Sequence, residues 1–177
     1  MNIKDIGLKD LRSQLTIIPQ DPVLFAGTLR ENLDPFLCKS DEEIWLALDN
    51  ASLKTYIMRQ PEKLEYTVLQ NGNNFSAGQR QLICLARALL RKTRILILDE
   101  ATAAIDVETD AIIQRTIRRE FKSATILTIA HRIQTVIDYD KIMVLDQGSI
   151  AEFDSPKDLL VNKSSKFYGL AHEAGLV

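Results

Sequence analysis

A run of four apolar residues that ends in two carboxylates constrains this sequence most. Residues 95–98 read ILIL, and Asp99 and Glu100 follow directly. A continuous apolar run of this length predicts a parallel strand covered on both faces. Its carboxylates would then lie at the carboxyl edge of a sheet, where open α/β folds bind ligands. An aspartate there suits Mg²⁺, and a neighbouring glutamate suits a general base that polarises water. Taken alone, the pair is also consistent with two solvated acids at a strand end.

The segment before this strand predicts a well-marked helix. Ser76 and Gln79 fit a capping box, and leucine and alanine side chains recur behind them on one helical face, at positions 82, 85, 86, 89 and 90. The residues around the cap read FSAGQ, from Phe75 to Gln79. A hydroxyl, exposed N–H groups and a glycine make a helix end that can bind an anion. An ordinary capping box is the alternative interpretation.

The rest of the chain alternates strands with helices. Apolar runs at 15–18, 123–130 and 141–146 predict buried strands, and the last turns at Gly148 into a hairpin. Asp106 is the expected N-cap of a helix that runs to about Phe121, and Pro156 the start of a terminal helix. Residues 28–70 look helical, with a capping box at Ser40 and Glu43. The pattern predicts an α/β fold with a mainly parallel sheet and an inserted helical subdomain.

The two motifs together resemble a known family. Gln79 and Asp99 stand 20 residues apart. In this order FSAGQ resembles the signature motif, and ILILDE the Walker B strand, of ATP-binding-cassette (ABC) nucleotide-binding domains. The resemblance covers nearly the whole chain and implies a P-loop NTPase-like fold. It implies that residues 1–177 are a partial domain, with residues 28–90 as the helical subdomain with the signature. Residues 91–177 would carry the Walker B strand, the D-loop, the switch histidine and the C-terminal part.

The resemblance also implies roles for residues that are unremarkable by themselves. Gln20 matches the Q-loop glutamine that contacts the metal and the attacking water; alone it would be a plain loop residue. Asp106 ends AAID, which matches the D-loop at the dimer interface. His131 matches the switch histidine on the γ-phosphate; alone it would be a structural residue at a strand end. The implied catalytic residues are Glu100 and His131, and the implied ATP-binding residues are Gln20, Ser76, Gly78, Gln79, Asp99 and Asp106. Gln20 and Asp99 are the implied ligands of Mg²⁺.

A finer resemblance concerns the subfamily. DPVLF (21–25) and GTLRENLDPF (27–36) resemble the second nucleotide-binding domain of the C subfamily, the multidrug-resistance-associated exporters. That implies an ATPase that powers export of organic anions or conjugates across a membrane. It implies head-to-tail pairing with a second nucleotide-binding domain, contact with transmembrane domains, and a place on the cytosolic face of the membrane. Ala77 departs from the glycine that the signature usually has.

One expected motif is missing from these residues. The sequence has seven glycines, none of them followed by lysine, so it contains no GxxxxGK[ST] phosphate-binding loop. We therefore expect that Met1 begins partway through a domain and that the isolated chain binds ATP weakly. Two alternatives stay open: a truncated, non-enzymatic interaction module, and a soluble ABC ATPase without transmembrane domains. The 56 residues from Gln20 to Ser76 leave no room for a long coiled-coil insertion.

Composition limits the partners and the compartment. With 22 basic and 24 acidic residues the net charge is −2, so no basic excess indicates a nucleic-acid partner. No apolar stretch approaches the roughly 18 to 20 residues of a membrane-spanning helix. Two cysteines, Cys38 and Cys84, suit a reducing compartment, and both are expected to be small buried side chains.

Overall fold

A computed structural model describes residues 2–99, 105–130 and 133–177 of the chain. Two of the predicted site residues, Glu100 and His131, lie outside the described residues. The chain forms two compact units, residues 1–129 and residues 130–177, and each is described by itself.

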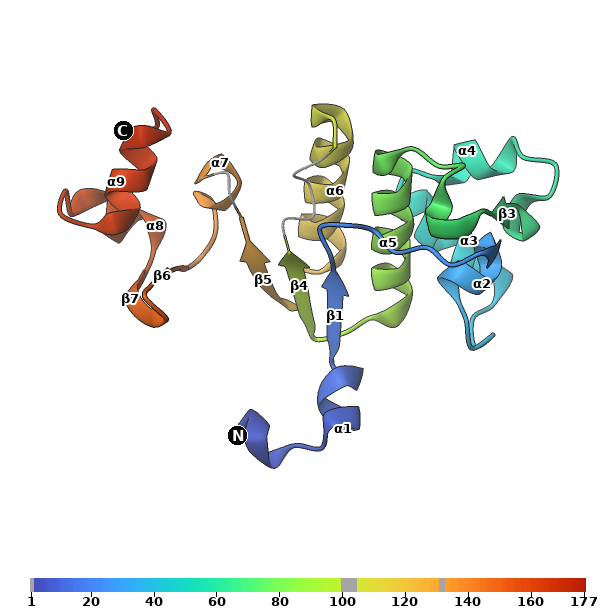
Figure 1. The fold of residues 1–177 in the computed structure, drawn as a ribbon, viewed down its shortest axis with the longest axis horizontal. Coiled ribbons are helices and arrows are strands. Elements are labelled where there is room, and N and C mark those ends of the chain that lie inside the picture. Colours follow the sequence, from blue (N-terminus) through green and yellow to red (C-terminus); the bar gives the residue numbers. More distant parts are fainter. Residues whose placement is uncertain (1, 100–104, 131–132) are drawn as a thin grey trace. The chain divides into compact units, whose positions relative to one another are not determined.

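The first unit is built on a parallel sheet of three strands. β1 (Leu15–Ile18), β4 (Ile95–Asp99) and β5 (Thr125–Ile129) lie side by side in the order β1-β4-β5 (Figure 1). α5 (Ala77–Arg91) leads into β4, and α6 (Val107–Glu120) connects β4 to β5. The predicted parallel α/β arrangement is therefore confirmed for this unit.

The core of this unit lies between the sheet and its two helices. Ile18, Leu96 and Leu98 are fully buried or nearly so, and they join one cluster with Leu85 of α5 and Ile113 of α6. The predicted apolar face of α5 is confirmed, since Leu82, Leu85, Ala86 and Leu90 are all buried.

β4 was predicted to be covered on both faces and β1 and β5 to be buried, but among the described residues all three strands are fully covered on one face at most. Ile17 is 58% exposed, Leu127 54% and Ile129 56%, and their neighbours Ile95 and Ile97 are only partly buried. Strand side chains alternate between faces, so the side chains that point away from α5 and α6 have little to pack against. An apolar run shows that a strand is suited to burial, but the neighbouring elements decide whether it is buried.

The inserted region between β1 and α5 is mainly helical. It contains α2 (Leu29–Leu33), α3 (Asp41–Asn50) and α4 (Lys54–Met58). The expectation of helix throughout 28–70 is corrected at two points: β2 (Gly27–Thr28) and β3 (Thr67–Val68) pair as antiparallel strands. Threonine and valine are β-branched and favour strands, and here a partner segment is available.

The first unit also contains α1 (Leu8–Ser13) and short helical turns at Ile3–Asp5, Lys63–Glu65 and Gln70–Gly72.

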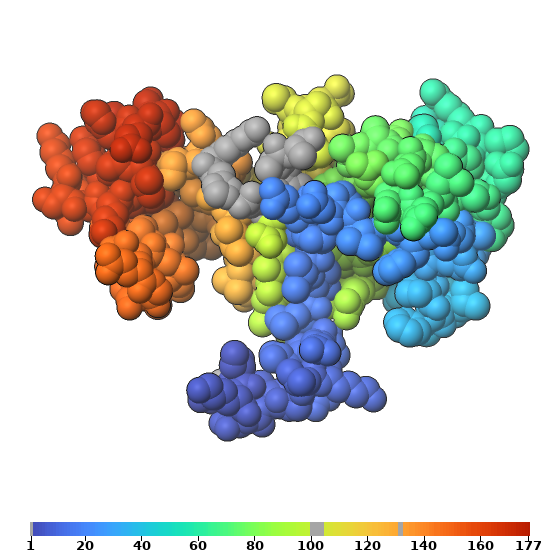
Figure 2. All heavy atoms as spheres, viewed as in Figure 1, coloured from blue at the N-terminus to red at the C-terminus, as the bar shows by residue number. Residues whose placement is uncertain are grey.

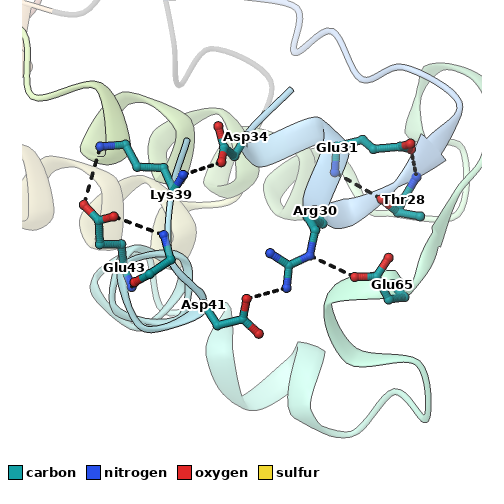
Figure 3. Close-up of polar contacts among 9 residues, drawn as sticks. Thr28, Arg30, Glu31, Asp34, Lys39, Asp41, Glu43 and Glu65 are labelled. Atoms are coloured by element: carbon teal, nitrogen blue, oxygen red, sulfur yellow. Dashed lines mark hydrogen bonds and ion pairs between the residues drawn. The ribbon is translucent and has the colours of Figure 1, made fainter. Parts of the chain in front are cut away.

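Polar contacts fix how the short helices of this insertion join (Figure 3). Arg30 of α2 contacts Asp41 at 2.7 Å and Glu65 at 2.9 Å, which ties α2 to the start of α3 and to the turn before β3. The predicted capping box at Ser40 and Glu43 is confirmed. The acids are exposed, so each pair contributes little free energy and mainly orients the helices.

The second unit is a hairpin followed by two helices. β6 (Ile142–Asp146) and β7 (Ser149–Asp154) are antiparallel, and Gly148 between them has a φ of 78°. α7 (Ile133–Val136) precedes them, and α8 (Pro156–Val161) and α9 (Lys166–Glu173) follow. The predicted hairpin and the helix start at Pro156 are confirmed.

Two expectations about burial need correction. The third predicted buried strand, β6, pairs with β7 alone among the described strands, and its Met143 and Leu145 are 50% and 66% exposed. Cys84 is buried as expected, whereas Cys38 is exposed in the loop before α3.

Candidate functional site

The carboxyl edge of the parallel sheet gathers two of the predicted site residues. Ile18, the last residue of β1, pairs with Leu98, so Gln20 and Asp99 both follow the same rung of the sheet. Asp99 in turn pairs with Ile129, the last residue of β5. Both predicted side chains are exposed at this edge. The edge therefore carries an amide oxygen and a carboxylate that face solvent.

These two oxygen donors fit the expected Mg²⁺ ion. Mg²⁺ binds oxygen ligands and commonly takes only one or two protein groups, with water and phosphate oxygens completing its shell. Glu100 follows Asp99 in the chain, and His131 follows β5 by two residues. Both residues lie outside the part of the chain that the structure describes.

The N-terminus of α5 is a confirmed capping box. The Ser76 hydroxyl accepts a hydrogen bond from the Gln79 N–H at 3.1 Å, and the Gln79 side-chain oxygen accepts one from the Ser76 N–H at 2.9 Å. Ser76 is exposed, so the positive end of a 15-residue helix faces solvent beside a hydroxyl. Such an end can bind an anionic group.

Aromatic packing holds this helix end in place. Phe75, which precedes the cap, is 3% exposed. Its ring meets Tyr66 edge-on, with centroids 5.7 Å apart, and Tyr56 at 6.3 Å. Both tyrosines belong to the helical insertion, so the first residue of FSAGQ anchors the start of α5 to that region.

The structure brings FSAGQ and the end of AAID together. Asp106 is the confirmed N-cap of α6: it accepts hydrogen bonds from the Thr109 N–H at 2.9 Å and from the Thr109 hydroxyl at 2.8 Å. Gly78 is buried against this cap, and a Cβ added there would lie 3.1 Å from Thr109 Oγ1 and 3.5 Å from Asp106 Oδ2. Two helix N-termini, capped by Ser76 and Asp106 and 30 residues apart in sequence, are therefore neighbours.

The hydrogen bonds at this cap also set its charge. The Thr109 backbone N–H, followed by the Thr109 side chain, holds the pKa of Asp106 below its usual value. Asp106 is therefore ionised at neutral pH, in direct contact with the helix that begins at Ser76.

Sequence reasoning missed a second group of polar residues on α5. Arg87 and Gln81 reach from this helix to the main chain of the loop that carries Gln20. The available signal was a charged residue within the otherwise apolar stretch ICLARALL (83–90). That position predicts a buried or half-buried cation with a specific partner.

Comparison with known proteins identifies the family. The family model described as "ABC transporter" matches residues 1–103, more than half of the chain. The chain belongs to the ABC transporter family. The resemblance drawn from FSAGQ and ILILDE is thereby confirmed, together with the ABC ATPase fold.

Curated ABC transporters are similar over almost every residue of this chain. ATP-binding cassette sub-family C member 3 of Homo sapiens is 60% identical over 99% of the chain. ATP-binding cassette transporter abc2 of Schizosaccharomyces pombe is 61% identical over 100% of it, and multidrug resistance protein mrp-7 of Caenorhabditis elegans 59% identical over 98%. The chain spans only 12%, 12% and 11% of these relatives.

A solved structure agrees with the fold. The structure of a bacterial Atm1-family ABC exporter with ATP bound matches 97% of this chain and 30% of that chain, with a TM-score of 0.88 and 35% identity. Among the described residues of this chain, none of the helices is long and apolar enough to cross a bilayer.

Proposed function

We propose that this chain forms the signature-bearing and catalytic-edge part of an ATP-hydrolysing cassette in an ABC exporter. The observation that carries the proposal is the contact between the two helix starts at Gly78 and Asp106. It joins the anion-binding end of α5 to an ionised N-cap, while Gln20 and Asp99 lie at the sheet edge. The chain thus offers two separate sets of groups for nucleotide.

The two sets act on different nucleotides in this proposal. Gln20, Asp99, Glu100 and His131 serve the nucleotide of their own cassette, with Glu100 as general base and His131 at the γ-phosphate. Ser76, Gly78 and Gln79 cover the nucleotide of a second, head-to-tail cassette, and Asp106 lies at the interface. Mg²⁺, when bound at Gln20 and Asp99, neutralises charge on the phosphate oxygens.

The names of the relatives support a role in transport, and their subfamily supports the proposed class of cargo. Three relatives are named as ABC transporters or as a multidrug resistance protein. We propose that the cassette pairs with a second nucleotide-binding domain and with transmembrane domains at the cytosolic face of a membrane. The proposed cargo is organic anions or conjugates. Within the cassette, residues 28–90 would act as the helical subdomain and residues 91–177 as the catalytic and C-terminal part.

A chimera tests the ATPase proposal. The segment of the S. pombe relative that matches this chain is replaced by the 177 residues, since the match spans the whole chain. We expect Mg-ATP hydrolysis by the chimera, and its loss in Glu100→Gln with ATP binding retained. Hydrolysis that persists in Glu100→Gln would contradict the catalytic assignment.

A second measurement tests the chain by itself. The 177 residues contain no GxxxxGK[ST] motif, so we expect weak binding of labelled Mg-ATP in equilibrium dialysis. Tight micromolar binding would show that these residues hold nucleotide without that motif.

A further inference from the structure

The loop that carries Gln20 is held by its main chain. The Pro19 carbonyl oxygen accepts a hydrogen bond from Gln81 Nε2 at 3.0 Å, and the Val23 carbonyl oxygen accepts one from Arg87 Nη1 at 2.6 Å. Both donors belong to α5, and the two acceptor residues lie on either side of Gln20 in the sequence. The side chain of Gln20 itself stays exposed. Residues 19–25, here called the Gln20 loop, are therefore attached to α5 by hydrogen bonds to their main-chain carbonyl oxygens.

Arg87 converges on neutral oxygens from two segments. Besides Val23, its guanidinium donates to the carbonyl oxygen of Asn32 and to Asn32 Oδ1, the latter at 2.7 Å. The side-chain amide of Asn32 also bonds the main chain of Phe25, accepting from its N–H at 2.9 Å and donating to its carbonyl at 2.8 Å. A guanidinium has five N–H donors in a fixed fork, which suits several converging oxygens. Asn32 and Arg87 thus fasten the far end of the Gln20 loop.

Gln81 occupies a costly position for a polar side chain. It is 1% exposed, and its Oε1 has no hydrogen-bond partner in the part of the chain that the structure describes. A buried acceptor without a partner is destabilising, and an apolar side chain there would avoid that cost. What Gln81 provides in return is its bond to Pro19, the residue beside Gln20.

Packing joins the Gln20 loop to the turn that precedes α5. Leu24 is 1% exposed, and a Cβ added at Gly72 would lie 2.6 Å from its Cδ1. Gly72 lies in the turn that leads to the signature. The space-filling view shows the blue residues after β1 directly against the green residues at the start of α5 (Figure 2).

We propose that Gln81 and Arg87 are positioning residues that make the Gln20 loop and the signature helix one rigid piece. The inference rests on the proposed function, because it links the two nucleotides that this chain would contact. A shift of α5 when Ser76 meets the nucleotide of the second cassette moves the main chain around Gln20. The signature of one site thereby sets the position of the metal-binding glutamine of the other.

Hydrogen–deuterium exchange on the 177-residue chain tests the mechanical link. Arg87→Lys keeps the charge but loses the fork, and we expect amide exchange in residues 20–25 to rise about tenfold, the effect of losing one charged hydrogen bond. Arg91→Lys is the matched control: Arg91 lies one turn further along α5, and among the described residues its guanidinium donates one long hydrogen bond, to the Arg12 carbonyl oxygen at 3.4 Å. Unchanged exchange in Arg87→Lys, or an equal rise in Arg91→Lys, overturns the proposal.

Gln81→Met provides a variant that is expected to fold whatever Arg87→Lys does. It removes the bond to Pro19 together with the unpartnered Oε1, so the two effects on stability oppose each other. Faster exchange near Gln20 at unchanged overall stability is the expected result. Exchange that stays at the wild-type rate counts against the proposal.

The Mg²⁺ dependence of ATP hydrolysis in the chimera tests the functional link. We expect the Mg²⁺ concentration for half-maximal activity to rise several-fold in Arg87→Lys and Gln81→Met, with the KM for ATP at saturating Mg²⁺ unchanged. A general loss of folded protein lowers the maximal rate and does not move that concentration. If the chimera is active and the Mg²⁺ concentration for half-maximal activity is the same in the variants as in the wild type, the proposal is overturned. If the wild-type chimera is inactive, the result contradicts the proposed function instead. The exchange measurements then decide this inference by themselves.

Discussion

Gly78→Ala places two opposing effects at one position of the signature helix. Replacing a helical glycine with alanine favours the helix by about 1 kcal/mol. The new methyl group, however, would lie 3.1 Å from Thr109 Oγ1 and 3.2 Å from Thr109 Cγ2. Overpacking of this kind typically costs about 1 to 3 kcal/mol. The sign of the result depends on whether Thr109 can move.

The structure indicates that Thr109 cannot move freely. Its N–H and its hydroxyl both donate to Asp106, at 2.9 and 2.8 Å, and these bonds form the cap of α6. A shift of Thr109 loosens that cap, so we expect the overpacking cost to exceed the gain in helix propensity. The expected net loss in the free energy of unfolding is about 1 kcal/mol.

Urea unfolding followed by the fluorescence of Trp45, the single tryptophan, measures this change in the first unit. Thr109→Ala removes both contacting atoms and leaves the backbone bond to Asp106, so in that background Gly78→Ala is expected to become neutral or stabilising. Gly169→Ala in α9 is the matched control, because no atom of the described residues lies within 4 Å of its added Cβ. There the propensity gain stands alone, and amide exchange in α9 should slow. A stabilising effect of Gly78→Ala in the wild-type background would refute the reasoning.

Three further predictions concern caps and thiols. Ser76→Ala removes the hydroxyl that accepts from Gln79 and should lower the free energy of unfolding by about 1 kcal/mol, whereas Ser76→Asn, which also caps helices, should stay close to wild type in the same urea titration. A thiol reagent at neutral pH should modify Cys38 rapidly and Cys84 only on unfolding, because Cys84 is buried and burial raises the pKa of its thiol. Rapid modification of both thiols in the folded protein would contradict this prediction. Burial alone would raise the pKa of Glu152, but hydrogen bonds from two N–H groups at the start of α9 and from the Ser165 hydroxyl, together with the charge of Lys166, outweigh it and leave the pKa below its usual value. Glu152 therefore stabilises α9 at neutral pH, and this contribution is lost as the pH falls through its folded-state pKa. We expect amide exchange in α9 to become faster, relative to the intrinsic rate, as the pH falls. In Glu152→Gln this pH dependence should be absent.

Much of the local structure was predictable from the sequence. The caps at Ser40, Ser76 and Asp106 were recognisable because an N-cap, with or without a capping box, is a local pattern within four residues. The amphipathic spacing of α5 and the apolar run of β4 were equally local. The two motifs also identified the family, because their order and spacing are properties of the sequence itself.

Other features were not predictable from local patterns. The run ILIL predicted a strand covered on both faces, but the structure covers one face with α5 and α6 and leaves Ile95 and Ile97 only partly buried. The short strand at Thr67–Val68 was missed because its partner, Gly27–Thr28, is distant in sequence. In both cases burial or pairing depends on a neighbour that the local sequence does not specify.

The sequence by itself determined which groups are present: the capped helix of FSAGQ, the carboxylate that ends β4, and membership of the ABC transporter family. Only the tertiary structure decided which of them meet. Gly78 meets the cap at Asp106, and α5 holds the Gln20 loop through bonds from Gln81 and Arg87 to residues 62 and 64 positions away. The physical reason is that such contacts require the chain to return to the same helix. A residue pattern specifies the donor, but the fold supplies the acceptor.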